Sequence, residues 1–425
     1  SYTHNVVVKE PAIFNFPKAK TFVLSNGLKV LYHHNDDTPK INIILEFKVR
    51  NYYDPDDKQG LCNFVSKMLT EGTENYTAQQ LADIIESRGI SLSSYPGGIA
   101  MSMLSEDLPF GLEILEKILN KATFRQQEIE KKRAQILADI KCFWDEPRYF
   151  GAQLVKEQLY KGHPYSKNYL GTKDSIESIT RDDLVHFYKQ YINPHGAKLA
   201  IVGNLGNYNL RDIGERIFGA WCNSSIESMK FPLLAQLKAQ EMNHYVNRDQ
   251  VVLCLARLSI DRKHSDYDKL LIFDQIFGGG ILNSMNSRLF QLREESGLFY
   301  TIKGSLLVGS NEQPGMFQVR TIVSLDRLQE AEKAIKKVID SAADKISSEE
   351  FIQAKRAIIN SLVDNFSSNS NIAQALLYLD RFNLPVDYFD TRTVMLDRIS
   401  LEETQKAVKN ILRSDDLLTL RIGRI

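Results

Sequence analysis

The side chains that could do chemistry in this chain are few and widely spaced. No two of its eight histidines are four residues apart, the spacing that would place two imidazoles on one helix face for a metal ion. His33 and His34 are adjacent and would face opposite sides of a strand. His163, between a glycine and a proline, is typical of a turn. The histidines are His4, His33, His34, His163, His186, His195, His244 and His264.

Two other common reactive motifs are also missing. The chain has no Gly-x-Ser-x-Gly nucleophile turn. The glycines at 278–280 are not followed by the Lys-Ser/Thr pair of a phosphate-binding loop. This glycine run favours a tight helix-to-loop turn, the alternative being close approach of the backbone to a bound peptide. The four cysteines lack CxxC spacing and are interpreted as small core residues or free thiols, with a disulfide as the alternative.

Composition excludes several classes of protein. Lys plus Arg and Asp plus Glu both number 53, so no global charge favours nucleic acid or an anionic membrane. No apolar run approaches the ~20 residues of a membrane-spanning helix. Residues 1–20 lack a signal-peptide pattern, and a signal cleaved from a precursor stays an open alternative. The length of 425 residues predicts two to four domains, at ~100–200 residues each.

The apolar periodicity predicts alternating strands and helices. Asn26-Gly27 between two apolar runs predicts a hairpin over residues 22–32 with a two-residue turn. Further strands are expected at 41–49, 99–104 and 197–202. Helices are expected at 60–69, 78–88 and 182–190, and one long helical stretch runs from Leu108 into the region 130–145.

The second half of the chain repeats the first. Residues 179–203 match 399–423 at an offset of 220, and the region from Glu128 matches that from Glu350 at an offset of 222. We therefore predict two homologous α+β halves, at 1–222 and 244–425, each a mainly antiparallel sheet with helices on one face. The segment 223–243, with three serines and Pro232, is interpreted as an inter-domain linker.

Several short blocks resemble the M16 (pitrilysin-like, mitochondrial-processing-peptidase-like) peptidases, in the family's order over nearly the whole chain. They are Asn26–Val30, Tyr53–Leu61, Met68–Thr73, Leu104–Leu108, Gly162–Tyr165, Gly278–Phe290 and Leu292–Tyr300. The resemblance implies the LuxS/MPP-like metallohydrolase fold. In this family a helix carries His-x-x-Glu-His, whose two histidines hold zinc while the glutamate activates water.

In this chain the zinc-binding residues of that motif are replaced. Asn63 and Lys67 stand at the two histidine positions, and Ser66 stands at the glutamate position. The downstream carboxylate of the family aligns with Asp139, one methylene shorter. An ammonium has no lone pair to donate at pH 7, and Asn is a poor zinc ligand. We therefore expect no metal and no cofactor in this chain.

A second functional element of the family matches residues in the C-terminal half. The resemblance implies that Arg293 and Tyr300 bind substrate, with Gly297 ending the helix so that Tyr300 lies on the next strand. The guanidinium would hold a substrate carbonyl, and the hydroxyl would donate to the oxyanion. From the residues alone, Arg293 could instead pair with Glu294 or Glu295, and Tyr300 could simply pack on the sheet.

A zinc-less half with this pair implies catalysis shared between chains. The expected protein is the non-zinc-binding subunit of a peptidase heterodimer, inactive alone, whose partner carries the zinc and which takes a peptide substrate. A homodimer is the form expected in isolation, with no nucleic acid and no membrane span. The alternative is a structural M16-like core protein without a peptidase role.

Peptide capture by edge-strand pairing is a further implication of the resemblance, over residues 90–99. Pro96 and the glycines at 97–98 make that edge a doubtful docking site. The compartment stays open: a bacterial periplasm or cytoplasm is favoured, and a mitochondrial matrix is the alternative.

Overall fold

The computed structural model describes residues 14–235, 238–278, 280 and 285–425. The backbone contacts divide the chain into two compact units. The N-terminal unit comprises 17–234 together with 366–380. The C-terminal unit comprises 235–365, 381–425 and the segment that ends at Phe16. No helix among the described residues is long and apolar enough to cross a membrane.

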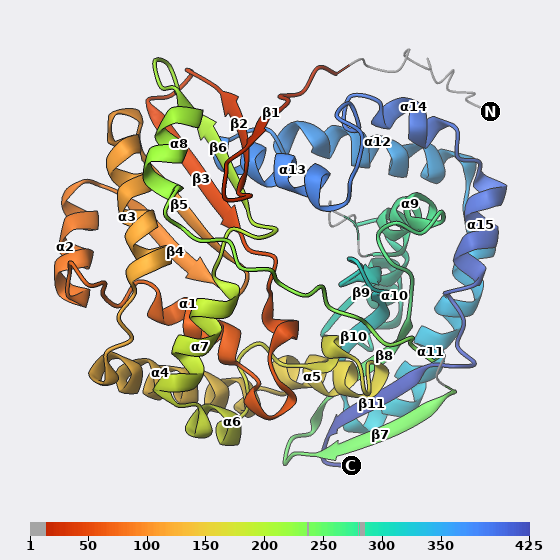
Figure 1. Cartoon of the computed structure of the whole chain (residues 1–425). Coiled ribbons are helices and arrows are strands. Elements are labelled where there is room, and N and C mark those ends of the chain that lie inside the picture. The colour runs from red at the N-terminus through yellow and green to blue at the C-terminus, as the bar shows by residue number, and fades with distance from the viewer. Residues whose placement is uncertain (1–13, 236–237, 279, 281–284) are drawn as a thin grey trace. The chain divides into compact units, whose positions relative to one another are not determined.

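The N-terminal unit is built on a mixed, mainly antiparallel sheet with the strand order β1-β2-β6-β3-β5-β4 (Figure 1). Its neighbouring strands are antiparallel except β2 and β6, which run parallel. The strands are β1 (Lys20–Val23), β2 (Lys29–His34), β3 (Lys40–Glu46), β4 (Ser91–Tyr95), β5 (Gly98–Leu104) and β6 (Lys198–Gly203). Strand β4 therefore lies at one edge of this sheet.

The predicted hairpin is present, but its loop is longer than the sequence indicated. The Leu24 and Leu28 backbones pair at 2.9 Å and leave a three-residue loop between them. Gly27 takes the left-handed conformation, with φ of 92°. The side-chain amide of Asn26 donates to the carbonyl oxygens of Phe218 and Trp221 at 2.8 and 3.1 Å. These distant contacts favour the longer loop, and residues near Asn26 alone could not reveal them.

Most helices of the N-terminal unit pack on one face of the sheet, where Ile41, Ile43 and Leu45 of β3 enter the main core. The predicted helix from Leu108 into 130–145 is two helices, because the chain turns at Phe124, a buried residue with φ of 49°. The helices of residues 17–234 are α1 (Leu61–Met68), α2 (Ala78–Ser87), α3 (Leu108–Lys121), α4 (Gln126–Asp145), α5 (Pro147–Leu159), α6 (Lys173–Ser178), α7 (Arg181–Tyr191) and α8 (Leu210–Phe218).

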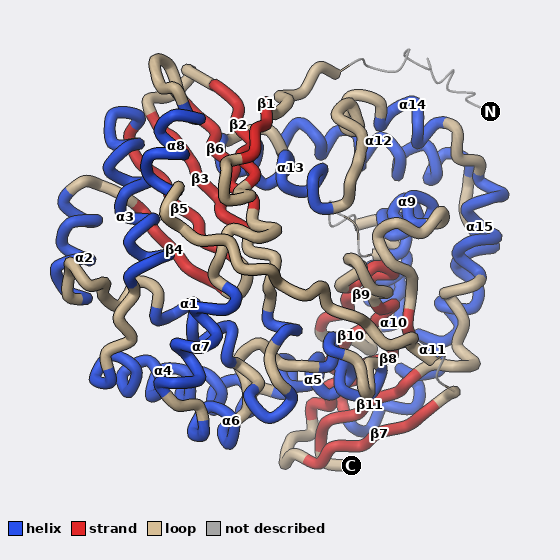
Figure 2. Tube along the Cα trace, viewed as in Figure 1, coloured by secondary structure: helices blue, strands red, loops and turns tan. Residues whose placement is uncertain are grey.

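The C-terminal unit repeats this arrangement with the strand order β7-β11-β8-β10-β9 (Figure 2). The strands are β7 (Gln240–Tyr245), β8 (Gln250–Leu258), β9 (Thr301–Val308), β10 (Met316–Ser324) and β11 (Leu418–Gly423). The helices are α9 (Tyr267–Phe277), α10 (Arg288–Ser296), α11 (Leu328–Ser341), α12 (Ser348–Asp364), α14 (Arg392–Asp397) and α15 (Leu401–Lys409). Strands β6 and β11 begin 220 residues apart, at Lys198 and Leu418, which is the offset read from the sequence.

Helix α13 (Asn369–Arg381) differs from the predicted division at residue 244. It packs on the second face of the N-terminal sheet, where Leu376 and Leu377 cluster with Leu31 and Ile44. The Asp380 carboxylate pairs with the ammonium of Lys198 at 2.7 Å and with that of Lys29. A segment from the second half of the sequence thus completes the first unit, and the N-terminal sheet has a helix on each side.

Much of the predicted linker also packs on the N-terminal unit. The Asn223 amide donates to the carbonyl of Asn26 at 2.8 Å, and Ile226 is buried in the N-terminal core. The Phe231 ring stacks on His163 with centroids 5.3 Å apart. Strand β7 begins at Gln240, so the segment between the docked part and the second sheet is much shorter than 223–243.

Candidate functional site

Helix α1, which carries the replaced motif, begins at a sharp backbone turn. Gly60 has φ of 92°, and a Cβ atom there would lie 2.7 Å from the carbonyl oxygen of Leu170. The carboxylate of Asp54 accepts the backbone N–H of Gly60 and of Cys62, both at 2.8 Å. Burial raises the pKa of Asp54 to about 7, while these N–H groups and Lys167 act in the opposite direction. The start of α1 is therefore fixed by tertiary contacts.

Two of the motif positions, Asn63 and Ser66, are buried. Asn63 is 3% exposed and Ser66 is 5% exposed. The Ser66 hydroxyl donates to the backbone carbonyl of Asn63 at 2.7 Å. The side-chain nitrogen Nδ2 of Asn63 has no hydrogen-bond acceptor among the described residues. Ser66 is thus committed to its own helix and is not placed as a base.

Lys67 and Asp139 complete the replaced positions. Helix α1 packs against α4, as the resemblance implies for the downstream ligand. Asp139 lies on an exposed side of α4, and Lys67 is half-buried. Within the part of the chain that the structure describes, neither side chain has a hydrogen bond or ion pair. The nearby bridge between α4 and the end of α1 is instead Lys132 to Glu71, at 3.0 Å.

These side chains do not fit zinc. The position offers an amide, an ammonium, a committed hydroxyl and one exposed carboxylate, whereas zinc sites use imidazole, thiolate and carboxylate ligands. A buried, unpartnered N–H of Asn63 and the positive charge of Lys67 both oppose a dication. In the described ranges, no three His, Cys, Asp or Glu side chains converge in a way that could hold a metal.

The predicted pair Arg293 and Tyr300 is brought together by the end of α10. Gly297 ends that helix in the left-handed conformation, with φ of 65°, as predicted. The Arg293 Nε donates to the backbone carbonyl of Tyr300 at 3.2 Å, and its Nη1 lies 3.7 Å from Glu294. Tyr300 lies one residue before β9, but its N–H already donates to Ile322 of β10 at 3.2 Å.

The Tyr300 side chain is left free for contact with another molecule. It is 76% exposed, although its backbone is held on both sides by Arg293 and by β10. Tyr300 therefore does not pack on the sheet, which was the alternative interpretation of this residue. Arg293 does contact Glu294, and that ion pair is exposed and weak in general.

The expected obstacle at the edge of the N-terminal sheet is absent. Pro96 and Gly97 form the turn between β4 and β5, and Gly97 has φ of 92°. Strand β4 itself contains Ser91–Tyr95, with no proline or glycine. The residues that weaken a strand therefore do not interrupt β4. Strand β4 also packs against α1.

The remaining candidates have structural roles. The buried His163 ring accepts the N–H of Tyr165 at 3.0 Å and stacks on Phe231, as suits a turn residue. Gly278 ends α9, while 279 and 281–284 lie outside the described residues. All four cysteines are free, two buried and two exposed: Cys62, Cys254, Cys142 and Cys222.

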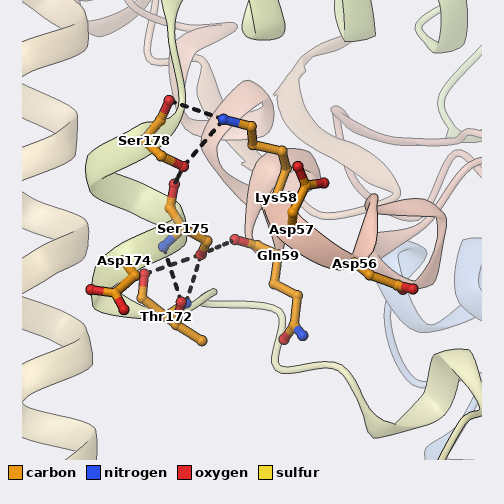
Figure 3. A pocket seen from close by; sticks show the side chains of 8 residues that line it. All are labelled: Asp56, Asp57, Lys58, Gln59, Thr172, Asp174, Ser175 and Ser178. Atoms are coloured by element: carbon orange, nitrogen blue, oxygen red, sulfur yellow. Dashed lines mark hydrogen bonds between the residues drawn. The ribbon is translucent and has the colours of Figure 1, made fainter.

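Sequence reasoning missed a polar cavity of about 440 Å³ in the N-terminal unit (Figure 3). The Lys58 ammonium donates to the carbonyl and hydroxyl oxygens of Ser178 at 3.1 and 3.2 Å. The Ser175 hydroxyl donates to the carbonyl of Gln59 at 2.7 Å. Its central polar groups bind one another, so the cavity has the character of a structural contact. Its lining residues come from segments over 100 positions apart, which left no local signal.

Two domain models match the chain. "Insulinase (Peptidase family M16)" matches residues 29–173, and "Peptidase M16 inactive domain" matches residues 178–358. An uncharacterized zinc protease of Rickettsia bellii is 27% identical over 412 residues, which are 93% of this chain and 92% of that protein. The non-peptidase homolog YmxG of Helicobacter pylori is 23% identical, over 91% and 90% of the two chains. The beta subunit of the Bos taurus mitochondrial-processing peptidase is 24% identical over 66% and 59%.

Solved structures agree on the fold. The peptidase M16 inactive domain of Pseudomonas fluorescens superposes with a TM-score of 0.86 at 23% identity, covering 96% of this chain and 98% of that one. A protease from Helicobacter pylori superposes with a TM-score of 0.85 at 16% identity, covering 96% and 100%. Together with the replacements at Asn63, Ser66 and Lys67, these matches identify a catalytically incomplete M16-like protein. The chain belongs to peptidase family M16.

Proposed function

We propose that this chain is the zinc-less subunit of a two-chain M16 peptidase and that it supplies Arg293 and Tyr300 to a partner's zinc site. The observation that carries the proposal is the geometry of Tyr300. Its backbone is held by β10 and by the Arg293 side chain, while its phenol is 76% exposed. A fixed backbone with a projecting hydroxyl is the arrangement that preorganised binding of a substrate or oxyanion requires.

Strand β9, which begins directly after Tyr300, is also held by helix α9. The carboxylate of Asp274 in α9 accepts the hydroxyl of Ser305 at 2.7 Å and the N–H of Leu306 at 2.8 Å, both in β9. Burial raises the pKa of Asp274 to about 6, and the two hydrogen bonds lower it in part. These bonds tie β9 to the helix layer and limit the freedom of the segment that begins at Tyr300.

Each residue has a role within this proposal. The Arg293 guanidinium retains donors beyond its bond to Tyr300, and these can hold a carbonyl oxygen of an extended peptide. The phenol of Tyr300 can donate to the oxygen that becomes negative when the peptide bond is attacked. The zinc of the partner would polarise the carbonyl and supply the attacking water. The position of β4 at the edge of the N-terminal sheet supports docking of an extended peptide by strand pairing.

The test is reconstitution with a zinc-bearing M16 protein of similar length that co-purifies with this chain. The mixture is expected to hydrolyse a fluorogenic peptide that neither protein cleaves alone. Tyr300→Phe should lower kcat/KM of the mixture by ~100-fold, because one oxyanion donor is lost. Arg293→Ala should act mainly through a higher KM. Full activity of the zinc protein without this chain would contradict the proposal.

Matched controls separate these roles from general surface effects. Tyr245→Phe removes a hydroxyl from another tyrosine of the C-terminal unit that is 63% exposed. Arg327→Ala removes a guanidinium as exposed as that of Arg293, with an acidic neighbour in both cases. Both controls should keep the activity of the unmodified mixture. If Tyr300→Phe and Arg293→Ala also keep it, the structural alternative replaces the peptidase role.

A further inference from the structure

The side chains on the Asn63–Lys67 face of α1 suit a negatively charged ligand instead of a metal cation. The two residues are one helical turn apart and lie on the same side of the helix. Asn63 holds a buried amide nitrogen without an acceptor, and Lys67 holds an ammonium without a partner, as far as the chain is described. Both groups are hydrogen-bond donors, and one carries a full positive charge. Such a pair is complementary to a negatively charged oxygen.

No neighbouring acid satisfies Lys67. Glu71, which follows the end of α1, is committed to Lys132 at 3.0 Å. Asp139, on the facing helix α4, forms no ion pair in the described structure. Strand β4, which also packs on α1, has no ionisable acid in its sequence Ser-Leu-Ser-Ser-Tyr. The positive charge is therefore available to a ligand.

We propose that the Asn63–Lys67 face is a carboxylate-binding site for a peptide whose backbone pairs with the edge of β4. The proposal rests on the peptide docking given under the proposed function and names the group that the N-terminal unit recognises. Because β4 packs against α1, a strand added at this edge passes close to that helix. The terminal carboxylate of such a peptide, or the side chain of an Asp or Glu within it, is the ligand.

The local chemistry favours this ligand over a neutral carbonyl. A carboxylate has two oxygens, so one can accept from Lys67 and the other from the amide of Asn63. The side-chain nitrogen of Asn63 is buried and has no acceptor in the described structure, so a carboxylate oxygen that reaches it would supply the missing partner.

The experiment measures binding of three fluorescent octapeptides of alternating valine and threonine to the isolated chain by anisotropy. The first has a free C-terminal carboxylate, the second is its C-terminal amide, and the third is the amide with one internal Glu. The acid should bind about fivefold more tightly than the amide at low salt. The Glu-containing amide distinguishes a side-chain carboxylate from a terminal one.

Substitutions at Lys67 and Asn63 test whether these side chains cause the preference for the acid peptide. Lys67→Met should weaken binding of the acid to the level of the amide and leave binding of the amide unchanged. Asn63→Leu, which keeps the charge but removes the donor, should produce a smaller loss, about twofold. The control is Lys131→Met, which removes an exposed lysine of α4 that is 3.7 Å from Glu128. It should leave the preference for acid over amide intact.

The outcomes separate this site from the docking on which it rests. Equal affinity for acid and amide in the unmodified chain would overturn the carboxylate site and leave peptide docking standing. A preference that survives Lys67→Met would assign the carboxylate to another position and also overturn the site. Absence of binding by all three peptides would overturn the docking at β4 and the site with it, while the role of Arg293 and Tyr300 would still be decided by the reconstituted mixture.

Discussion

Helix α1 of the N-terminal unit and the α10–β9 segment of the C-terminal unit are held in a similar way but differ in the side chains that they expose. In each region a buried carboxylate fixes the element: Asp54 holds the start of α1, and Asp274 holds β9. At α1 the motif positions do not fit zinc, and Asn63 and Ser66 are buried while Lys67 is half-buried. At α10–β9, Tyr300 is kept on the surface. A buried carboxylate thus anchors both an element that does not fit zinc and an element that exposes a tyrosine.

We expect the largest change from restoring the zinc-binding motif of α1. Asn63→His, Ser66→Glu, Lys67→His and Asp139→Glu together should increase zinc affinity by ~1000-fold, since three ligands would again converge on an intact scaffold. Isothermal titration and metal analysis measure the effect. A quadruple variant that folds but holds no zinc would show that α1 and α4 no longer have the required geometry.

The two buried carboxylates give each region its own pH dependence. Their pKa values, about 7 for Asp54 and about 6 for Asp274, lie above the usual value of 3.8. The folded protein therefore binds more protons, and stability falls as the pH rises from about 4 to the folded pKa. Asp54 contributes a loss of up to about 4 kcal/mol that is complete above pH 7, and Asp274 about 3 kcal/mol that is complete nearer pH 6.

Urea unfolding from pH 4 to 8 checks this difference. Asp54→Asn should remove a loss that extends from about pH 4 to 7, whereas Asp274→Asn should remove only a loss that ends near pH 6 and leave the part between pH 6 and 7. The measured quantity is the difference in unfolding free energy between each variant and the unmodified chain at each pH. This difference is needed because other groups titrate too. Identical pH profiles for the two variants would contradict the separate assignments.

Gly60 stands at the start of α1 and Gly297 at the end of α10, and we expect their substitution to lower the unfolding free energy by unequal amounts. Gly60 has φ of 92° and a Cβ there would meet the Leu170 carbonyl at 2.7 Å, whereas Gly297 has φ of 65° and open space around it. Gly60→Ala should cost about 3 kcal/mol of unfolding free energy, from strain and a backbone clash, and Gly297→Ala about 1 kcal/mol, from strain alone. Equal losses in denaturant midpoint would show that the start of α1 adjusts freely.

Substituting Asn63, whose amide nitrogen has no acceptor in the described structure, should change the unfolding free energy only slightly. Asn63→Leu should raise the unfolding free energy by about 1 kcal/mol, since a buried donor without an acceptor is replaced by an apolar group of similar size. Tyr300→Phe, at a side chain 76% exposed, should change it by less than about 0.5 kcal/mol. A destabilised Asn63→Leu variant would mean that the amide has a partner in solution.

Local patterns sufficed for several features of the molecule. The repeat at 220 residues, the left-handed Gly297 at the end of α10 and the amide, hydroxyl and ammonium at the replaced motif could all be read from the chain. Each of these depends on residues within one or two turns of a helix, or on a pattern that occurs twice. The position of Tyr300 beside β9 followed from the same local reasoning, with an error of one residue.

Other features were decided by contacts between residues far apart. Helix α13 completes the N-terminal sheet through Leu31 and Ile44, although over 300 residues separate them in the chain. The length of the first hairpin loop depends on Asn26 reaching Phe218. The burial of Asp54 and the free edge of β4 likewise arise only when strands and loops assemble. Sequence periodicity records which face of an element is apolar, but it does not record which distant segment covers that face, because burial depends on the whole fold.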